Sequence, residues 1–139
     1  MPALGGASAD PLRFLDFLIR DPMQTILLHK SGVPATVPAP ERYAVHKLIV
    51  ASRRFNDGQS AVKRDKDIRQ AELLFEALLH TRRASDVALV YNEAWQRGQA
   101  WQDGIRVGAG MMTDNGRYRL RESLRVGALQ IGEDVTMPF

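Results

Sequence analysis

PAPERYAVHKLIVASRRFNDGQSAVKRDKDIRQA, residues 38–71, is the stretch of this 139-residue chain with the clearest secondary-structure signals. After the proline bend, apolar residues recur at helical spacing and predict an amphipathic helix over residues 41–54. These positions are Ala44, Val45, Leu48, Ile49 and Ala51. A turn at Asn56-Asp57-Gly58 separates this helix from a second one, predicted over residues 61–79. The block therefore predicts two consecutive helices, each burying one face.

The segments on either side of this block predict a mixed fold. The dense apolar run Leu12–Ile19, with its phenylalanines, is typical of a strand, and Val33–Val37 predicts a short edge strand. Between them, Asp21-Pro22 indicates the start of a helix. Downstream, helices are predicted over residues 86–97 and 99–107. We expect an α+β fold, in which a short β-containing N-terminal part precedes a bundle of three to four helices.

The chain divides into three parts by composition. Residues 1–11 are small and polar and predict a flexible lead-in. Residues 12–112 predict the folded domain. Residues 113–139 are rich in arginine and glycine and lack a clear period, so we expect an extension that is either disordered or an arm docking on another subunit. Such an arm would make the protein a homo-oligomer.

Composition excludes several classes of protein. The chain has no cysteine, which rules out disulfides, zinc–thiolate sites and thiol nucleophiles. No apolar run approaches the 18 residues of a membrane span, and the first residues lack the features of a signal peptide. We therefore expect a cytoplasmic protein without a membrane partner.

The formal net charge of +3 is mildly basic. It indicates either a solvated surface with a small arginine excess or an affinity for phosphates or nucleic acid. Arginines and aromatic residues do not interleave, so nucleic acid is not the partner we expect.

Asp16 is the first candidate for chemistry. In a strand it would share one face with Leu12, Phe14 and Leu18, because alternate residues point the same way. A carboxylate in an apolar face needs a partner. The alternatives are an ion pair with an arginine from the helices, or a metal-binding or catalytic role.

Lys47 and Arg54 are seven residues apart, nearly two helical turns, and so lie on one side of the predicted helix. Two cations in this arrangement suit a phosphate chain, and the alternative is a solvated basic face. His46 is next to Lys47, and a lone histidine on a helix is more often a packing or surface residue than a base.

The second helix carries a polar stripe opposite its apolar face. Lys63, Lys66, Asp67 and Gln70 form this stripe. Asp67 either pairs weakly with Lys63 along the helix or orients Lys47 or Arg54 across the interface of the two helices. Tyr91, Trp95 and Trp101 are expected to pack in the core rather than to stack on bases. No phosphate-binding loop, dinucleotide-binding turn or nucleophile elbow is present.

Taken together, VPAPERYAVHKLIVASRR, the following KRDKDIRQAELL and the preceding PLRFLDFLI resemble the C-terminal portion of a bacterial family of nucleotidyltransferase-fold proteins. The sequence is more distantly similar to the abortive-infection toxin nucleotidyltransferases. The shared pattern is Pro40-Glu41, then Lys47, then Arg53 or Arg54, then Lys66-Asp67. The resemblance covers about residues 4–112.

The resemblance implies transfer of a nucleoside monophosphate from a nucleoside triphosphate, with carboxylates that hold Mg²⁺. It implies that Asp16 is a catalytic, metal-binding acid. Lys47, Arg53 and Arg54 would bind phosphate. Glu41, Lys63, Lys66 and Asp67 would form a supporting polar cluster.

The sequence departs from the family in one respect. A glycine–serine turn and a D-x-D pair should precede Asp16 by many residues, but only 15 residues come before it. Two of three expected metal-binding carboxylates are therefore missing. We expect a partial nucleotidyltransferase-like protein that is inactive on its own. The alternative is a helical module that binds a protein or a nucleotide without catalysis.

Overall fold

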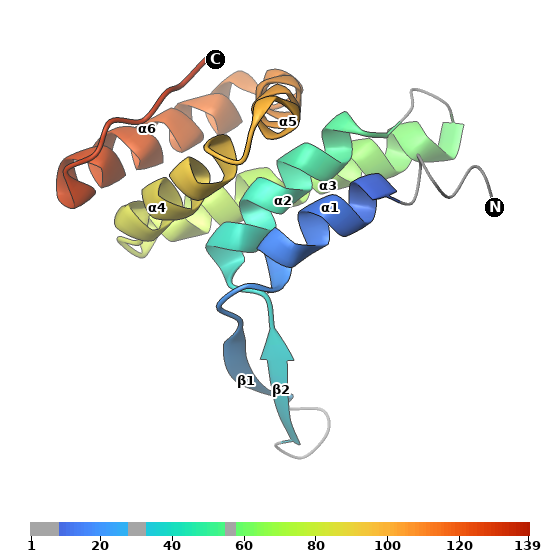
Figure 1. Ribbon diagram of the computed structural model, residues 1–139, viewed down its shortest axis with the longest axis horizontal. Coiled ribbons are helices and arrows are strands. Elements are labelled where there is room, and N and C mark those ends of the chain that lie inside the picture. Colours follow the sequence, from blue (N-terminus) through green and yellow to red (C-terminus); the bar gives the residue numbers. More distant parts are fainter. Residues whose placement is uncertain (1–8, 28–32, 55–57) are drawn as a thin grey trace.

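The computed structural model describes residues 9–27, 33–54 and 58–139, and this part of the chain forms a body of six helices (Figure 1). The helices are α1 (Ala9–Ile19), α2 (Pro40–Ser52), α3 (Gly58–His80), α4 (Ala84–Trp95), α5 (Gln99–Gly110) and α6 (Asp114–Ile131). Helix α2 lies at the centre and packs against α1, α3, α4 and α5, while α6 packs against α3 and α4. Two strands, β1 (Met23–Leu27) and β2 (Val33–Val37), form an antiparallel hairpin that projects from one end of this body.

The prediction of an α+β fold is wrong. The described core residues belong to the six helices and to the segments that join or follow them. The hairpin pairs Met23 with Val37 and Leu27 with Val33, and it stays outside the helical packing. The fold is therefore helical, with the hairpin as an appendage.

The segment Leu12–Ile19 is a helix, not the strand predicted from its apolar run. Phe14 and Phe17 are both buried, while Leu15 and Ile19 are exposed. Buried residues three apart follow the helical period, whereas a strand would bury alternate residues. Continuous apolar runs do not distinguish the two structures by periodicity, which is why the prediction failed.

The segment after Asp21-Pro22 also differs from its prediction, since it begins strand β1 and not a helix. Asp21 has a φ of 51°, a left-handed conformation unlike the extended backbone of a helix N-cap. The chain turns at this residue and leaves the helical body (Figure 1).

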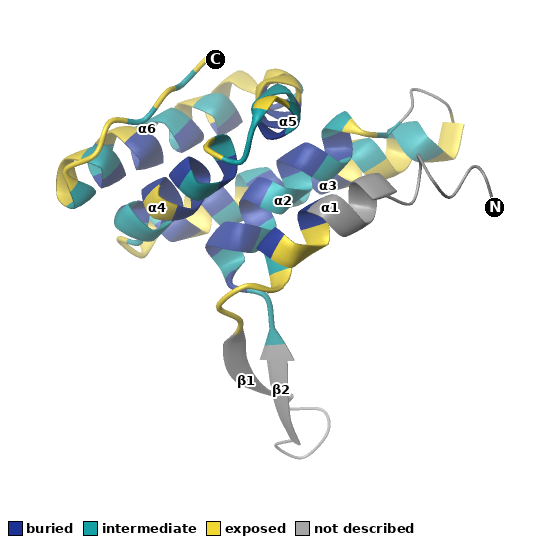
Figure 2. Ribbon diagram, in the orientation of Figure 1, coloured by how far each residue is buried: buried dark blue, intermediate teal, exposed yellow. Residues whose placement is uncertain are grey.

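The four helices predicted over residues 41–107 are confirmed, within a few residues at each end. All five apolar positions predicted for α2 are buried, and the dark stripe of buried residues follows that helix in Figure 2. Tyr91 and Trp101 are buried and Trp95 is partly buried, as expected for packing residues. Within the described ranges, no helix combines the length and the apolar character that crossing a bilayer requires.

Residues Asp114–Ile131 form α6, and Val135, Met137 and Phe139 after it pack against the core, which differs from the disordered extension that was one of the two expectations. Thr113 caps α6 by accepting a hydrogen bond from the Gly116 amide at 3.0 Å. After α6, the chain runs back beside α4, where the Tyr91 hydroxyl donates to the Thr136 carbonyl at 2.6 Å. Of the predicted lead-in, residues 1–8 lie outside the described residues.

Candidate functional site

A hollow of about 400 Å³ lies where α2 faces the first half of α3. Its lining is almost wholly polar and consists of Tyr43, Lys47, Arg54, Lys63, Lys66, Asp67 and Gln70. Helix α2 supplies the first two side chains, α3 supplies the last four, and Arg54 follows the end of α2. The structure thus brings the polar stripe of α3 to the same place as the basic side of α2.

Asp67 is the residue that joins the two helices at this site. Its side chain belongs to α3 and is buried, with the residue only 4% exposed. Its Oδ1 accepts a hydrogen bond from Lys47 Nζ at 2.9 Å, and its Oδ2 accepts one from Arg54 Nε at 2.7 Å. Of the two alternatives for Asp67, the contact across the helix interface is therefore the one that the structure contains.

Lys47 remains a cation despite its partial burial. Burial alone would lower the pKa of its ammonium group, but the hydrogen bond and the charge of Asp67 outweigh it, and the pKa is raised. The Tyr43 ring, one turn before Lys47 on α2, lies 5.0 Å from the ammonium nitrogen. Tyr43 was missed in the sequence, although its spacing of four residues from Lys47 is the signal that places it on the same face.

His46 contributes no charge to the site at neutral pH. Burial, followed by the neighbouring Lys47 charge, lowers the pKa of its imidazole to about 4. His46 is therefore neutral, as expected for a packing residue.

The hollow carries an excess of positive charge. Four cations and one carboxylate line it, which leaves three positive charges in excess. Lys63 and Lys66 are exposed at its edge and form no ion pair with another described residue. The arrangement is chemically suited to an anion with several charges, because ammonium and guanidinium groups bind phosphate oxygens through charge-assisted hydrogen bonds.

Two predicted residues lie away from the hollow. Arg53 points toward α1, where its guanidinium lies over the Phe14 ring at 5.2 Å. Glu41, at the other end of α2, pairs with Arg83 at 2.5 Å, and burial raises the pKa of its carboxyl although Arg83 opposes this.

Asp16 also lies away from the hollow, and the expectation that it sits in an apolar face is wrong. Its side chain is 81% exposed, and its Oδ2 lies 3.6 Å from Arg97 Nη1. The helical conformation of α1 turns Asp16 away from the buried Phe14 and Phe17. The described contacts of Asp16 are those of a surface ion pair.

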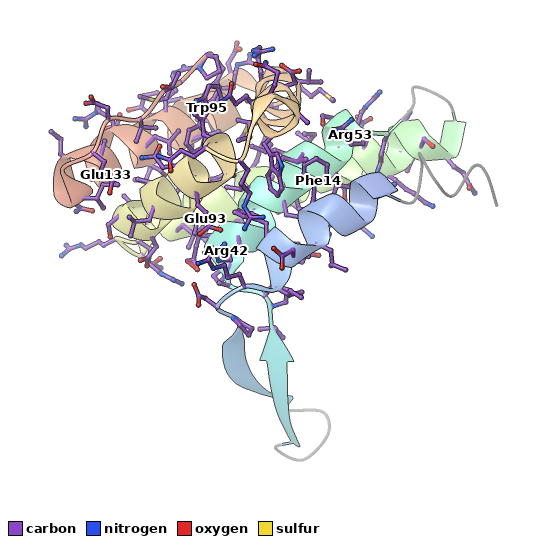
Figure 3. All side chains as sticks on the ribbon, viewed as in Figure 1. Phe14, Arg42, Arg53, Glu93, Trp95 and Glu133 are labelled. Atoms are coloured by element: carbon purple, nitrogen blue, oxygen red, sulfur yellow. The ribbon has the colours of Figure 1, made fainter. Side chains whose placement is uncertain are left out.

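Asp16 belongs to a second polar cluster, which is centred on Arg42 of α2. Arg42 is 5% exposed and donates to both carboxylate oxygens of Glu93 on α4, at 2.7 and 2.8 Å (Figure 3). It also donates to the Phe17 carbonyl at 3.3 Å and contacts the Asp21 carboxylate at 3.5 Å. The Glu93 carboxylate in turn accepts from Arg97, the partner of Asp16. These contacts join α1, the start of the hairpin, α2 and α4.

The acids of the described residues do not fit a Mg²⁺ site. Magnesium is bound mainly through carboxylates and other oxygen ligands. Among residues 9–27, 33–54 and 58–139, no three acidic or histidine side chains converge on one point. Both oxygens of Asp67 accept from cations, and Asp16 pairs with Arg97. No step of a reaction is therefore derived through a metal held by these residues.

A family model described as nucleotidyltransferase matches residues 1–96, which are 96 of the 139 residues. The matched region ends just after α4 and includes every residue that lines the hollow. No curated protein and no solved structure shows significant similarity to the chain.

Proposed function

The chain belongs to the nucleotidyltransferase family whose model matches residues 1–96, and on this premise we propose that the hollow between α2 and α3 binds the phosphate chain of a nucleoside triphosphate. The observation that carries the proposal is the excess of three positive charges in a polar hollow. A triphosphate offers several negative charges along a short chain, and this is the anion that such a group of cations complements.

The two central cations have donors left over for a ligand. Arg54 uses Nε for Asp67, so its two terminal nitrogens are available to grip phosphate oxygens in a fork. Lys47 donates one of its three ammonium hydrogens to Asp67. Asp67 thereby holds both cations in position before the ligand arrives, which lowers the conformational entropy lost on binding.

The exposed lysines of α3 extend this site. Lys63 and Lys66 are close to one helical turn apart and lie at the rim of the hollow. A phosphate chain that begins at Lys47 and Arg54 can therefore continue along α3. We propose that these lysines add attraction for the chain without fixing its orientation, since a lysine is a flexible point charge.

Lys47→Ala is expected to weaken binding of ATP by at least about tenfold, because a charged hydrogen bond to phosphate contributes roughly 1.5–3 kcal/mol. Isothermal titration calorimetry of the full chain with ATP measures this change. Arg106→Ala is the matched control, since it removes a cation from the exposed face of α5, where Arg106 pairs with Asp103. Equal losses in the two variants, or unchanged binding in Lys47→Ala, would contradict the proposed site.

We further propose that this chain does not transfer nucleotides by itself, since its described acids assemble no Mg²⁺ site. With Mg²⁺ and each of the four nucleoside triphosphates, we expect no pyrophosphate above that of a buffer control. Release of pyrophosphate that is lost in Lys47→Ala would show instead that the chain is an active transferase. If calorimetry detects no triphosphate binding either, the hypothesis of a protein-interaction module takes its place.

A further inference from the structure

The hollow contains one feature that opposes its proposed ligand, a buried carboxylate at the centre of the cations. Asp67 is 4% exposed, and each of its oxygens takes one cation, Lys47 at 2.9 Å and Arg54 at 2.7 Å. A phosphate group would use two of its oxygens for the same two cations. The carboxylate therefore occupies the electrostatic position of one phosphate group of a ligand.

We propose that Asp67 is the internal counter-ion of the anion site, which holds Lys47 and Arg54 in the empty hollow and lowers the affinity of the hollow for phosphate chains. This inference rests on the proposed function, because it assumes that the hollow binds a phosphate chain. It assigns Asp67 a regulatory effect on affinity, and it is distinct from a role in which Asp67 contacts the ligand or a metal.

The contacts of Asp67 with Lys47 and Arg54 explain why a buried carboxylate is needed at this site. Without a carboxylate, Lys47 and Arg54 would lie near each other on the same side of α2 as like charges, and burial would favour loss of the lysine proton. With Asp67 in place, the pKa of Lys47 is raised in spite of burial. The protein thus keeps both cations charged and in place, at the cost of a negative charge close to the ligand.

The negative charge of Asp67 repels a bound phosphate and so lowers the affinity of the hollow for it. A phosphate bound to the remaining donors of Lys47 and Arg54 would lie roughly 6 Å from the Asp67 carboxylate, two hydrogen-bond lengths across the cation, in partly hydrated surroundings. At that distance one like charge lowers the affinity by about tenfold. Asp67→Asn removes the negative charge. Lys47 and Arg54 keep part of their orientation in this variant, because the amide oxygen still accepts one hydrogen bond.

The test uses inorganic tripolyphosphate as the probe, because it carries the phosphate chain without a base or sugar. Calorimetry with the full chain is expected to show that Asp67→Asn binds tripolyphosphate about tenfold more tightly than the unsubstituted protein does. The affinity of the variant should also fall more steeply with added salt, because the hollow has gained one net positive charge.

Asp65→Asn is the matched control. It removes the same charge from the same helix, but the Asp65 side chain is 75% exposed and pairs with Arg64. The affinity of Asp65→Asn for tripolyphosphate is expected to differ by less than about twofold from that of the unsubstituted protein, since water screens an exposed charge. An equal gain in affinity in both variants would overturn the proposal, because the change in net charge would then be enough to explain the gain.

The other outcomes are equally decisive. Weaker or unchanged binding in folded Asp67→Asn, with clear binding in the unsubstituted protein, overturns the counter-ion role and leaves the proposed function standing. Failure of both proteins to bind tripolyphosphate overturns the proposed function as well.

If Asp67→Asn does not fold, the carboxylate ¹³C resonance of Asp67 is followed in the unsubstituted protein. A shift of the Asp67 resonance on adding tripolyphosphate, with Asp65 unmoved, supports the counter-ion role because it puts the bound phosphate close to the Asp67 carboxylate, and an unmoved Asp67 resonance overturns that role.

Discussion

Replacing Arg42 with alanine is expected to lower the free energy of unfolding by about 3 kcal/mol, because it breaks a buried ion pair from one side. The guanidinium of Arg42 is the common partner of the Glu93 carboxylate, the Phe17 carbonyl and the Asp21 carboxylate. Alanine removes the donor that these acceptors share, leaving Glu93 with Arg97, and it removes the guanidinium that lies over the Phe17 ring, 5.1 Å from its centre. Urea unfolding followed by circular dichroism measures the change.

The ion pair between Arg42 and Glu93 also makes the free energy of unfolding decrease at acidic pH. The hydrogen bond from Arg42 lowers the pKa of the Glu93 carboxyl below its ordinary value of 4.5. Glu93 therefore stabilises the fold fully above that value, and the contribution is lost as the pH falls through the lowered pKa. In Arg42→Ala this acid-dependent loss should be smaller than in the unsubstituted protein.

Arg106→Ala serves as the comparison for Arg42→Ala. Arg106 makes an exposed pair with Asp103 within one helix, and its removal should change the free energy of unfolding by less than about 0.5 kcal/mol. A small effect of Arg42→Ala, similar to that of Arg106→Ala, would show that the cluster around Arg42 does not hold α1, α2 and α4 together.

Gly108→Ala is expected to destabilise the protein by about 3 kcal/mol, because the added methyl group would meet backbone and not a movable side chain. A Cβ atom at Gly108 would lie against the Leu48 carbonyl group, 2.8 Å from its carbon and 2.9 Å from Leu48 Cβ. Helix α5 would then have to move away from α2 along their whole contact. Thermal unfolding measures the loss.

Gly110→Ala tests the same substitution two residues later on the same helix. A Cβ atom at Gly110 would have nothing within 4 Å. This variant should therefore be at least as stable as the unsubstituted protein, with a gain of up to about 1 kcal/mol, since only helix propensity changes. If both variants are equally stable, α2 and α5 are not in the close contact described above.

Much of the helical body was predictable from local patterns. The apolar positions of α2 recur with the helical period over about two turns, which is the pattern of a helix that buries one face. The seven-residue spacing of Lys47 and Arg54 likewise places two cations on one side of any helix that contains them. Both conclusions depend only on the geometry of one element.

The errors came from segments whose pattern fits two structures. The run Leu12–Ile19 is apolar at nearly every position, so its sequence cannot indicate which residues face the core. Packing against α2 and Trp101 decides this, since Phe14 and Phe17 lie 4.5 and 5.5 Å from the Trp101 ring. Asp16 was misplaced for the same reason, because its face follows from the conformation of α1.

Within residues 38–71, the sequence by itself determined two amphipathic helices, their buried faces and a basic side on the first of them. Only the tertiary structure decided what that basic side faces. Asp67 had a lysine within reach on its own helix, yet it pairs with Lys47 and Arg54 of the other. The physical reason is burial: a carboxylate enclosed between two helices needs strong donors close by, and α2 supplies two of them, while Lys63 remains in solvent at the edge of the hollow.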